Sequence, residues 1–245
     1  MKEHTGAIIL AAGKGTRMKS KDVNKVALLL GGRPMISYSV RILIGIGVSP
    51  IVVVVGFAKE SIKKALGDTV LYAEQKKRLG TAHAVMCGLK KLPEDVQNVL
   101  VIQGDDSAFY TDKIFEELLS LHRERQASLT LLTIEKDNPT GLGRVYRNDV
   151  GEVVAIVEEK DATDEQRKIT EINPALYVFS RVFLEKYLPK VKKSPVTGEY
   201  YITHLIDIAI ANNEALATVK GGKMNWRGVN TPQELQEAEN MLAGV

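Results

Sequence analysis

LAAGKGTRM, residues 10–18, is the stretch on which the interpretation of the whole chain rests, because it directly follows an apolar, strand-like run at Ala7–Leu10. Gly13 and Gly15 permit backbone conformations closed to other residues, so that successive N–H groups can converge on an anion. Arg17 adds a fixed fork of donors suited to phosphate oxygens, and Lys14 adds a mobile charge. In an open α/β sheet, the end of a strand followed by such a loop is where a nucleotide triphosphate would sit.

Two common glycine motifs do not fit this stretch. The P-loop requires a glycine, four residues and then Gly-Lys-Ser/Thr, whereas Gly13-Lys14 is preceded by leucine and alanine residues and followed by Gly15. The dinucleotide fingerprint requires a small residue where Met18 stands. The alternative that remains is a solvated turn between strand and helix that merely contains two glycines.

Composition describes an ordinary globular protein. The chain has 245 residues, 44% hydrophobic and 26% charged, and no linker-like segment, so we expect a single domain over residues 1–245. A net charge of +3, from 33 basic and 30 acidic residues, argues against a nucleic-acid partner. The single cysteine, Cys87, excludes an internal disulfide and is expected to be a small buried hydrophobe. Without a signal peptide or a transmembrane run, we expect a cytoplasmic protein with no membrane partner.

The first half alternates strands with helices, which predicts an α/β fold with a Rossmann-like, mostly parallel sheet flanked by helices. This nucleotide-binding half is expected over about residues 1–110. Ile51–Val55 is apolar throughout and therefore reads as a strand buried on both faces. The predicted strands are Ala7–Ala12, Ile51–Val55, Thr69–Ala73 and Asn98–Ile102, and the predicted helices are Pro34–Gly45, Lys59–Leu66 and Thr81–Lys91.

The second half is mixed, with a sugar-binding subregion expected over about residues 111–230 and a C-terminal helix over 231–245. Pro174 interrupts one strand, which suggests a sheet edge or a bulge. Thr231 and Glu234 form a capping-box signal at the last helix. The predicted elements are a helix at Asp112–Gln126, a strand at Leu129–Ile134, a hairpin of Arg144–Tyr146 and Val153–Val157, a strand at Ile172–Phe179, a helix at Tyr200–Ala211 and a strand at Ala215–Val219.

Polar residues at the predicted strand ends are candidates for ligand binding. Asp105 follows an apolar strand, where its carboxylate is suited to Mg²⁺ beside a triphosphate; the alternative is that Asp105 and Asp106 form a solvated turn. Gln75 can recognise a nucleobase edge, or simply be solvated. Gly143, Glu158 and Asn173 offer a backbone N–H, a carboxylate and an amide to a hydroxyl-rich sugar. His83, Tyr200 and Tyr201 are expected to be structural.

Motifs along nearly the whole chain resemble the sugar-1-phosphate nucleotidyltransferase family, and most of all the uridylyltransferase domains of bacterial N-acetylglucosamine-1-phosphate uridylyltransferases. They are LAAGKGTRM, Lys25, Ala73–Gln75, Leu79–Val85, Gly104-Asp105, Gly141–Arg144, Ile156–Arg167, Glu171–Asn173, Gly198–Thr203 and Gly228–Thr231. The resemblance implies Mg²⁺-dependent uridylyl transfer from UTP to N-acetylglucosamine 1-phosphate, giving UDP-N-acetylglucosamine and pyrophosphate.

The resemblance also implies roles for particular residues. Arg17, Lys25 and Asp105 would be catalytic, with Asp105 and Asn230 holding Mg²⁺. The sugar would contact Gly143, Glu158 and Asn173. The nucleotide would contact Leu10, Ala11, Ala12, Gly13, Gly15, Gln75, Gly80 and Thr81.

Several positions depart from the family pattern. Asn24 replaces a proline, which is expected to loosen the loop before Lys25, and Pro174-Ala175 replaces Thr-Gly after Asn173. Gln103 and residues 106–109 also differ from the pattern around Gly104-Asp105. The chain lacks hexapeptide repeats, so we expect no left-handed β-helix acetyltransferase domain and no trimer built on one. The alternatives are another acceptor or base, such as glucose 1-phosphate or a thymidine nucleotide, and a non-catalytic binding module.

Overall fold

The computed structural model describes residues 4–244, which divide into two compact units. Unit 1 comprises the described residues up to Arg78, together with Ala84–Asp112 and the residues from Asn225 onward. Unit 2 comprises Leu79–His83 and Lys113–Met224. Each unit is therefore assembled from segments that are separated along the chain. No helix among residues 4–244 combines the length and the apolar character needed to cross a membrane.

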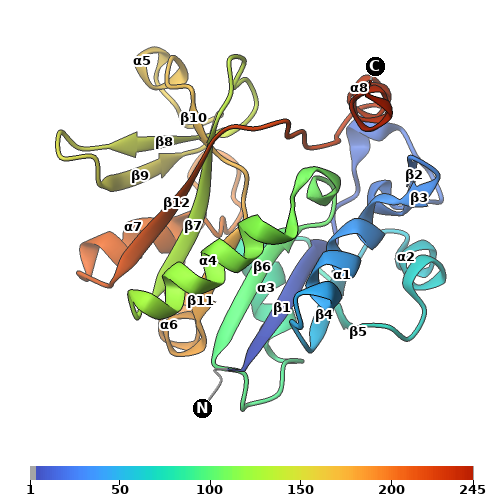
Figure 1. Ribbon diagram of the computed structural model, residues 1–245, viewed down its shortest axis with the longest axis horizontal. Helices are drawn as coiled ribbons and strands as arrows, with labels where there is room; N and C mark the ends of the chain where they lie inside the picture. The colour runs from blue at the N-terminus through green and yellow to red at the C-terminus, as the bar shows by residue number, and fades with distance from the viewer. Residues whose placement is uncertain (1–3, 245) are drawn as a thin grey trace. The chain divides into compact units, whose positions relative to one another are not determined.

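Unit 1 is built on four parallel strands in the order β5-β4-β1-β6 (Figure 1). All five residues of β4 are buried, as the continuous apolar run predicted. Because the strands are parallel, their carboxyl ends share one edge, and the loops that follow them are neighbours there. The strands are β1 (Thr5–Ala11), β4 (Ile51–Val55), β5 (Leu71–Glu74) and β6 (Asn98–Gln103).

Helices pack against these strands, and the expected alternation is confirmed. Helix α3 approaches β1 closely at Gly88, where a Cβ would lie 2.7 Å from the Ile8 side chain. Cys87 on the same helix is half-buried, so the expectation of a buried residue is wrong. The elements are α1 (Met35–Gly45), α2 (Lys59–Leu66), α3 (Thr81–Leu89, in unit 1 from Ala84) and the hairpin of β2 (Leu29–Leu30) and β3 (Arg33–Pro34).

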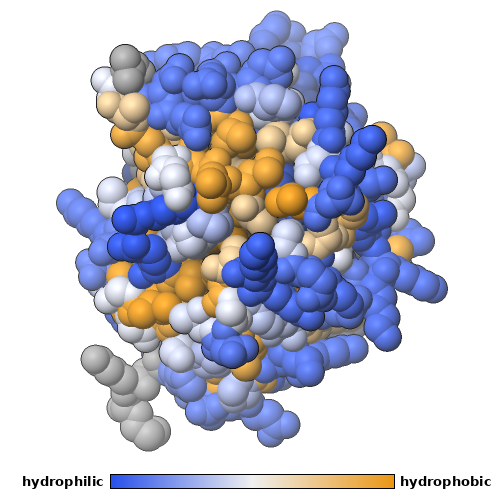
Figure 2. Space-filling view, turned by 90° about the vertical axis from the view of Figure 1, so that its right-hand side faces the viewer, coloured by the Kyte–Doolittle hydropathy of each residue, from blue (hydrophilic) through white to orange (hydrophobic). Residues whose placement is uncertain are grey.

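The C-terminal helix α8 (Pro232–Ala243) closes unit 1. Thr231 caps it and Glu234 completes the capping box, as the sequence predicted. Ala238 of α8 joins Leu30, Met35 and Val229 in a small apolar core. On the side of the molecule where α8 and the β2–β3 hairpin lie in Figure 1, apolar residues gather among hydrophilic ones (Figure 2). Exposed apolar area of this kind is common on folded proteins.

Unit 2 contains a mixed sheet in the order β11-β7-β10-β8-β9, with β12 running parallel to β7. The predicted hairpin is present, since β8 and β9 are antiparallel. The strands are β7 (Leu129–Glu135), β8 (Gly143–Arg147), β9 (Val153–Val157), β10 (Glu171–Asn173), β11 (Tyr177–Ser180) and β12 (Leu216–Lys223). The helices are α4 (Asp112–Glu124, in unit 2 from Lys113), α5 (Asp164–Arg167), α6 (Arg181–Tyr187) and α7 (His204–Ala211).

The interruption at Pro174 is not a sheet edge, because β10 pairs with β7 on one side and β8 on the other. It is instead an irregularity that divides the predicted strand into β10 and β11. Ile172 pairs with Ile134 and Tyr177 pairs with Leu131, so more residues lie on one strand than on its partner.

The predicted helix start at Tyr200 is also wrong, since α7 begins at His204. Tyr200 and Tyr201 are half-buried and lie ahead of the helix, so they are not core residues.

Candidate active site

The loop after β1 is attached to the neighbouring strand ends of unit 1. The Gly104 N–H donates to the Leu10 carbonyl (3.1 Å), and the Phe57 N–H donates to the Ala12 carbonyl (3.3 Å). A Cβ on Gly56 would lie 2.7 Å from that same Ala12 oxygen, so only glycine permits this close approach. The backbone at the end of β1, where nucleotide contacts were predicted, is therefore held in place by β4 and β6.

The two glycines of this loop, Gly13 and Gly15, differ in backbone conformation and in the space around them. Gly15 has φ of 57°, and a Cβ there would press against the Lys25 side chain. Gly13 does not have a left-handed φ, so the expectation that both glycines need this freedom is wrong. A Cβ on Gly13 would meet no atom within 4 Å, which leaves its backbone open to a ligand. Arg17 is exposed and forms no ion pair within the part of the chain that the structure describes.

Asn24 stabilises the loop before Lys25, so the expectation that it loosens this loop is wrong. The side chain is fully buried. Its amide nitrogen donates to the carbonyls of Ala11 (3.1 Å), Gly13 (3.1 Å) and Phe57 (2.8 Å), and its amide oxygen accepts from the Val26 N–H (3.2 Å). Where a proline would only fix φ, this asparagine ties two loops to the short 3₁₀ helix Lys25–Ala27.

Lys25 brings together the two oxygen donors expected around a cation. Its Nζ donates to the Asp105 carboxylate and to the Asn230 amide oxygen (2.7 Å), and also to the Val229 carbonyl (3.3 Å). The Lys25 and Asp105 side chains are only 16% and 11% exposed. Asp105 follows β6 and Asn230 precedes α8, so the fold of unit 1 places these distant segments around one positive charge.

Asp106 is not part of a solvated turn, contrary to the alternative interpretation. It is 2% exposed, and its carboxyl accepts hydrogen bonds from the Tyr110 hydroxyl (2.9 Å) and from Trp226 Nε1 (3.3 Å). Burial, and then the nearby Asp105 charge, raise the pKa of Asp106 well above its usual value. The sequence analysis missed Tyr110 and Trp226; the available signal was the single tryptophan just before Gly228–Thr231.

The donor set suits a divalent cation of the Mg²⁺ type. Among residues 4–244 there is no group of three or more His, Cys, Asp and Glu side chains placed to hold a metal ion. Mg²⁺ does not require one, because it usually takes one or two carboxylates and completes its shell with water and substrate phosphates. One carboxylate and one amide oxygen that already share an ammonium group fit that requirement. Asp105 and Asn230 are the residues that would hold the ion.

Two predicted nucleotide contacts, Gly80 and Thr81, fall in unit 2. A Cβ on Gly80 would lie 2.5 Å from the Tyr200 carbonyl oxygen, and its φ is 106°. The Thr81 hydroxyl accepts from the Ile202 N–H (2.9 Å). These contacts engage the backbone of residues 200–202 and explain the later start of α7. Gln75, in unit 1, is 4% exposed, which excludes the solvated alternative for its side chain.

Unit 2 brings together the three predicted sugar contacts. Asn173 and Gly143 are register partners in β10 and β8, and Glu158 Oε2 would lie 3.6 Å from a Cβ on Gly143. Glu158 accepts from the Thr203 hydroxyl (2.9 Å), and burial raises its pKa above the usual 4.5. The Asn173 amide oxygen accepts from the Ala175 N–H (3.1 Å), and its nitrogen donates to the Tyr177 hydroxyl.

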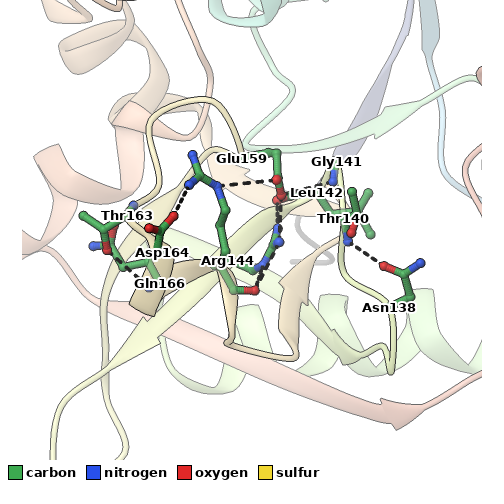
Figure 3. A network of polar contacts seen from close by, with 10 residues as sticks. Asn138, Thr140, Gly141, Leu142, Arg144, Glu159, Thr163, Asp164 and Gln166 are labelled. Atoms are coloured by element: carbon green, nitrogen blue, oxygen red, sulfur yellow. Dashed lines mark hydrogen bonds and ion pairs between the residues drawn. The ribbon is translucent and has the colours of Figure 1, made fainter.

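A buried arginine supports this cluster (Figure 3). Arg144 is 2% exposed, and its guanidinium donates to Glu159 (2.7 Å) and to the carbonyls of Leu142 and Arg167. Glu159 also accepts from the Gly141 N–H (3.1 Å). Arg144 and Glu159 directly follow Gly143 and Glu158, so this network fixes the backbone next to both predicted sugar contacts.

Comparisons with known proteins identify the family of the chain. A family model described as nucleotidyl transferase matches residues 6–244. The chain is 42% identical over 237 residues to the bifunctional protein GlmU of Exiguobacterium sibiricum and 38% identical over 237 residues to that of Bacillus subtilis. Each match covers 96% of this chain and 52% of the relative, so the chain spans about half the length of the curated relatives it matches.

A solved structure shares the fold. It is a Bacillus anthracis protein described as a glucose-1-phosphate thymidylyltransferase, in complex with sucrose, and it matches with a TM-score of 0.82 and 21% identity over 98% of this chain and 96% of that one. Because the identity is low, this likeness bears on the fold alone. The family match over nearly all described residues, together with the two GlmU relatives, shows that the chain belongs to the nucleotidyl transferase family.

Proposed function

We propose that the chain transfers a uridylyl group from UTP to N-acetylglucosamine 1-phosphate, forming UDP-N-acetylglucosamine and pyrophosphate. The family match and the motif resemblance support nucleotidyl transfer. The observation that carries the proposal is the convergence of Asp105 and Asn230 on the Lys25 ammonium group. A non-catalytic binding module would have no need for this arrangement.

The reaction requires positioning and charge more than a protein nucleophile. An oxygen of the sugar phosphate attacks the α-phosphorus of UTP, the bond to the β-phosphate breaks, and pyrophosphate leaves with the electron pair. Arg17 is free to bind phosphate oxygens, and Lys25 can exchange its bond to Asp105 for one to phosphate. Held by Asp105 and Asn230, Mg²⁺ would supply further positive charge against the triphosphate.

The remaining predicted residues bind and orient the substrates. The open backbone at Gly13 and the buried amide of Gln75 would contact the nucleotide. Glu158 would accept a hydrogen bond from a sugar hydroxyl, and Gly143 would donate its N–H. Asn173 retains one amide hydrogen for the sugar after its bond to Tyr177.

One observation favours a second candidate, a transferase for a different sugar 1-phosphate such as glucose 1-phosphate, with UTP or a thymidine nucleotide. Pro174-Ala175 replaces the Thr-Gly of the family pattern, and the Ala175 N–H holds the amide oxygen of Asn173. A change beside a predicted sugar contact can alter which sugar substituent is accepted.

The decisive experiment measures pyrophosphate release from UTP, dTTP and CTP with a panel of sugar 1-phosphates. We expect the highest kcat/KM for UTP with N-acetylglucosamine 1-phosphate, and no release without a divalent cation. A clear preference for glucose 1-phosphate would establish the second candidate. Tight nucleotide binding without pyrophosphate release from any pair would instead indicate a binding module.

A further inference from the structure

A buried carboxyl group in unit 1 joins two segments that are far apart in the sequence. Asp106 Oδ2 accepts from the Tyr110 hydroxyl (2.9 Å) and from Trp226 Nε1 (3.3 Å), while Trp226 Nε1 also donates to the Tyr110 oxygen (2.9 Å). The exposed fractions of Asp106, Tyr110 and Trp226 are 2%, 5% and 4%. The three polar groups therefore form a closed triangle away from solvent.

Packing alone does not account for a carboxyl group at this place. Asp106 Oδ1 is buried and accepts no hydrogen bond from the described residues. A buried polar atom without a partner costs stability, and an apolar side chain of similar size would avoid that cost. The position of the triangle suggests what the carboxyl group does.

Two corners of the triangle, Asp106 and Trp226, lie close along the chain to the two predicted metal ligands. Asp106 follows Asp105, and the Trp226 segment continues to Asn230. A Cβ on Gly228 would lie 3.6 Å from Trp226 Cη2 and 3.7 Å from Asn230 Nδ2, so the indole ring and the amide flank the same glycine. The Val229 N–H donates to the Asp105 carbonyl (3.2 Å), which links the two segments once more.

The other side of Asn230 has its own anchor. Glu234 Oε2 accepts from the Asn230 N–H (2.6 Å) and from the Thr231 N–H (2.9 Å) as part of the α8 capping box. The backbone of Asn230 is thus held from α8 on one side and from Trp226 on the other. Loss of the triangle would therefore release the backbone before Asn230 and leave its attachment to α8 intact.

We propose that Asp106, Tyr110 and Trp226 are positioning residues that keep Asp105 and Asn230 at the separation needed to share one divalent cation. This role deepens the proposed function and rests on its assignment of Asp105 and Asn230 as metal ligands. Residues that orient metal ligands without touching the metal commonly change metal affinity when they are replaced. Neither Tyr110 nor Trp226 is a catalytic residue in this scheme.

The test uses the single tryptophan of the chain as its reporter. Wild type, Tyr110→Phe and Tyr38→Phe are titrated with Mn²⁺ in the presence of UTP while Trp226 emission is recorded, and pyrophosphate release is titrated in parallel. Tyr38→Phe is the matched control, because its hydroxyl also donates one part-buried hydrogen bond in unit 1, to the Leu30 carbonyl (2.8 Å). Thermal unfolding establishes that each variant is folded.

We expect Tyr110→Phe to raise the half-saturating Mn²⁺ concentration by about tenfold in both titrations, with the control unchanged. A folded Tyr110→Phe with the wild-type midpoint, or an equal shift in Tyr38→Phe, would overturn the positioning role. The positioning role would also be overturned if Trp226 emission of the wild type did not change with Mn²⁺ although pyrophosphate release required Mn²⁺. If Tyr110→Phe does not fold, Trp226→Phe replaces it, and the measured quantity is the increase in unfolding temperature on addition of Mn²⁺. We expect Trp226→Phe to need about tenfold more Mn²⁺ than wild type for the same increase.

The same data separate this proposal from the proposed function. Wild-type protein that releases no pyrophosphate with any sugar 1-phosphate, but whose Trp226 emission responds to Mn²⁺ and shifts in Tyr110→Phe, would remove the activity and keep the positioning role. If wild-type protein released pyrophosphate normally but the Mn²⁺ midpoint of Tyr110→Phe were unchanged, the proposed function would stand and the positioning role would be removed.

Discussion

The cluster around Lys25 in unit 1 and the cluster around Glu158 in unit 2 satisfy their polar groups in different ways. Lys25 bonds to both Asp105 and Asn230, and all three are predicted to contact the phosphates or the metal. Glu158 instead bonds to Thr203, and Asn173 to Ala175 and Tyr177, which lie outside the predicted sugar contacts.

This difference separates two ways of building a site. Under the proposed function, Lys25 and Asp105 in unit 1 exchange their mutual bond for bonds to ligands, so their replacement should act mainly on turnover. In unit 2 the surrounding residues hold the cluster in shape, so changes there should act mainly on stability and on sugar affinity.

Replacing Asp105 should give the largest effect. Asp105→Asn keeps the size of the side chain but removes the negative charge that would hold the metal, and we expect turnover to fall by about a hundredfold or more. The measurement is the rate of pyrophosphate release at saturating substrates. Asp95→Asn, which removes a carboxylate from an exposed pair with His4 in the same unit, should leave the rate unchanged. Near-normal turnover of Asp105→Asn would remove Asp105 from the mechanism.

The sequence predicted best those elements whose signals are local. The bounds of β4 and α2 match the prediction, because an apolar run flanked by turn residues and a short amphipathic segment are both complete within a few residues. The start of α7 was mispredicted because residues 200–202 bond to Leu79, Ala82 and the Thr81 side chain. Helical periodicity carries no information about those partners.

The same limit applies to the candidate site. The prediction that Asp105 and Asn230 lie close together came from the motif resemblance. The metal-binding role of Asp105 was also predicted from its position at a strand end. The effect of Asn24 could not be predicted, since its acceptors are carbonyls of Ala11, Gly13 and Phe57 that the fold brings to it. The burial of Asp106 beside Trp226 likewise depends on where the segment before α8 runs.

Gly80→Ala tests whether unit 2 depends on close backbone packing, as the comparison requires. The new Cβ would lie 2.5 Å from the Tyr200 carbonyl oxygen, so the turn at Gly80 must move. We expect a loss of about 2–4 kcal/mol in the free energy of unfolding, from overpacking and a positive φ together. The control is Gly151→Ala, where φ is 82° but no atom lies within 4 Å of the new Cβ. Equal losses in the two variants would show that the contact with Tyr200 does not matter.

Asn24→Ala tests whether unit 1 also contains a side chain with a structural role, because the neutral Asn24 side chain holds the loop after β1 in shape. Its removal leaves the carbonyls of Ala11, Gly13 and Phe57 without this donor in one buried and two part-buried hydrogen bonds, and we expect the free energy of unfolding to fall by about 1–3 kcal/mol and the KM for UTP to rise. Denaturant unfolding and initial rates measure the two effects. Asn212→Ala removes an exposed amide bond to the Ile208 carbonyl and should change neither. An unchanged KM for UTP would mean that the loop keeps its shape without Asn24.

Ala175→Gly should have the smallest effect and the opposite sign. Ala175 has φ of 61°, a conformation that favours glycine, yet its N–H still reaches the Asn173 amide oxygen. Glycine relieves the backbone strain but makes the unfolded chain more flexible, so we expect a net gain of about 0.5–1 kcal/mol in the free energy of unfolding. Ala211→Gly, at the end of α7 without a positive φ, should be destabilising instead. If Ala175→Gly gains stability and keeps the wild-type KM for the sugar phosphate, the turn beside Asn173 is set by the scaffold rather than by the residue at 175. A loss of sugar affinity would show instead that Ala175 takes part in choosing the sugar, and that unit 2 is tuned for its substrate as directly as unit 1.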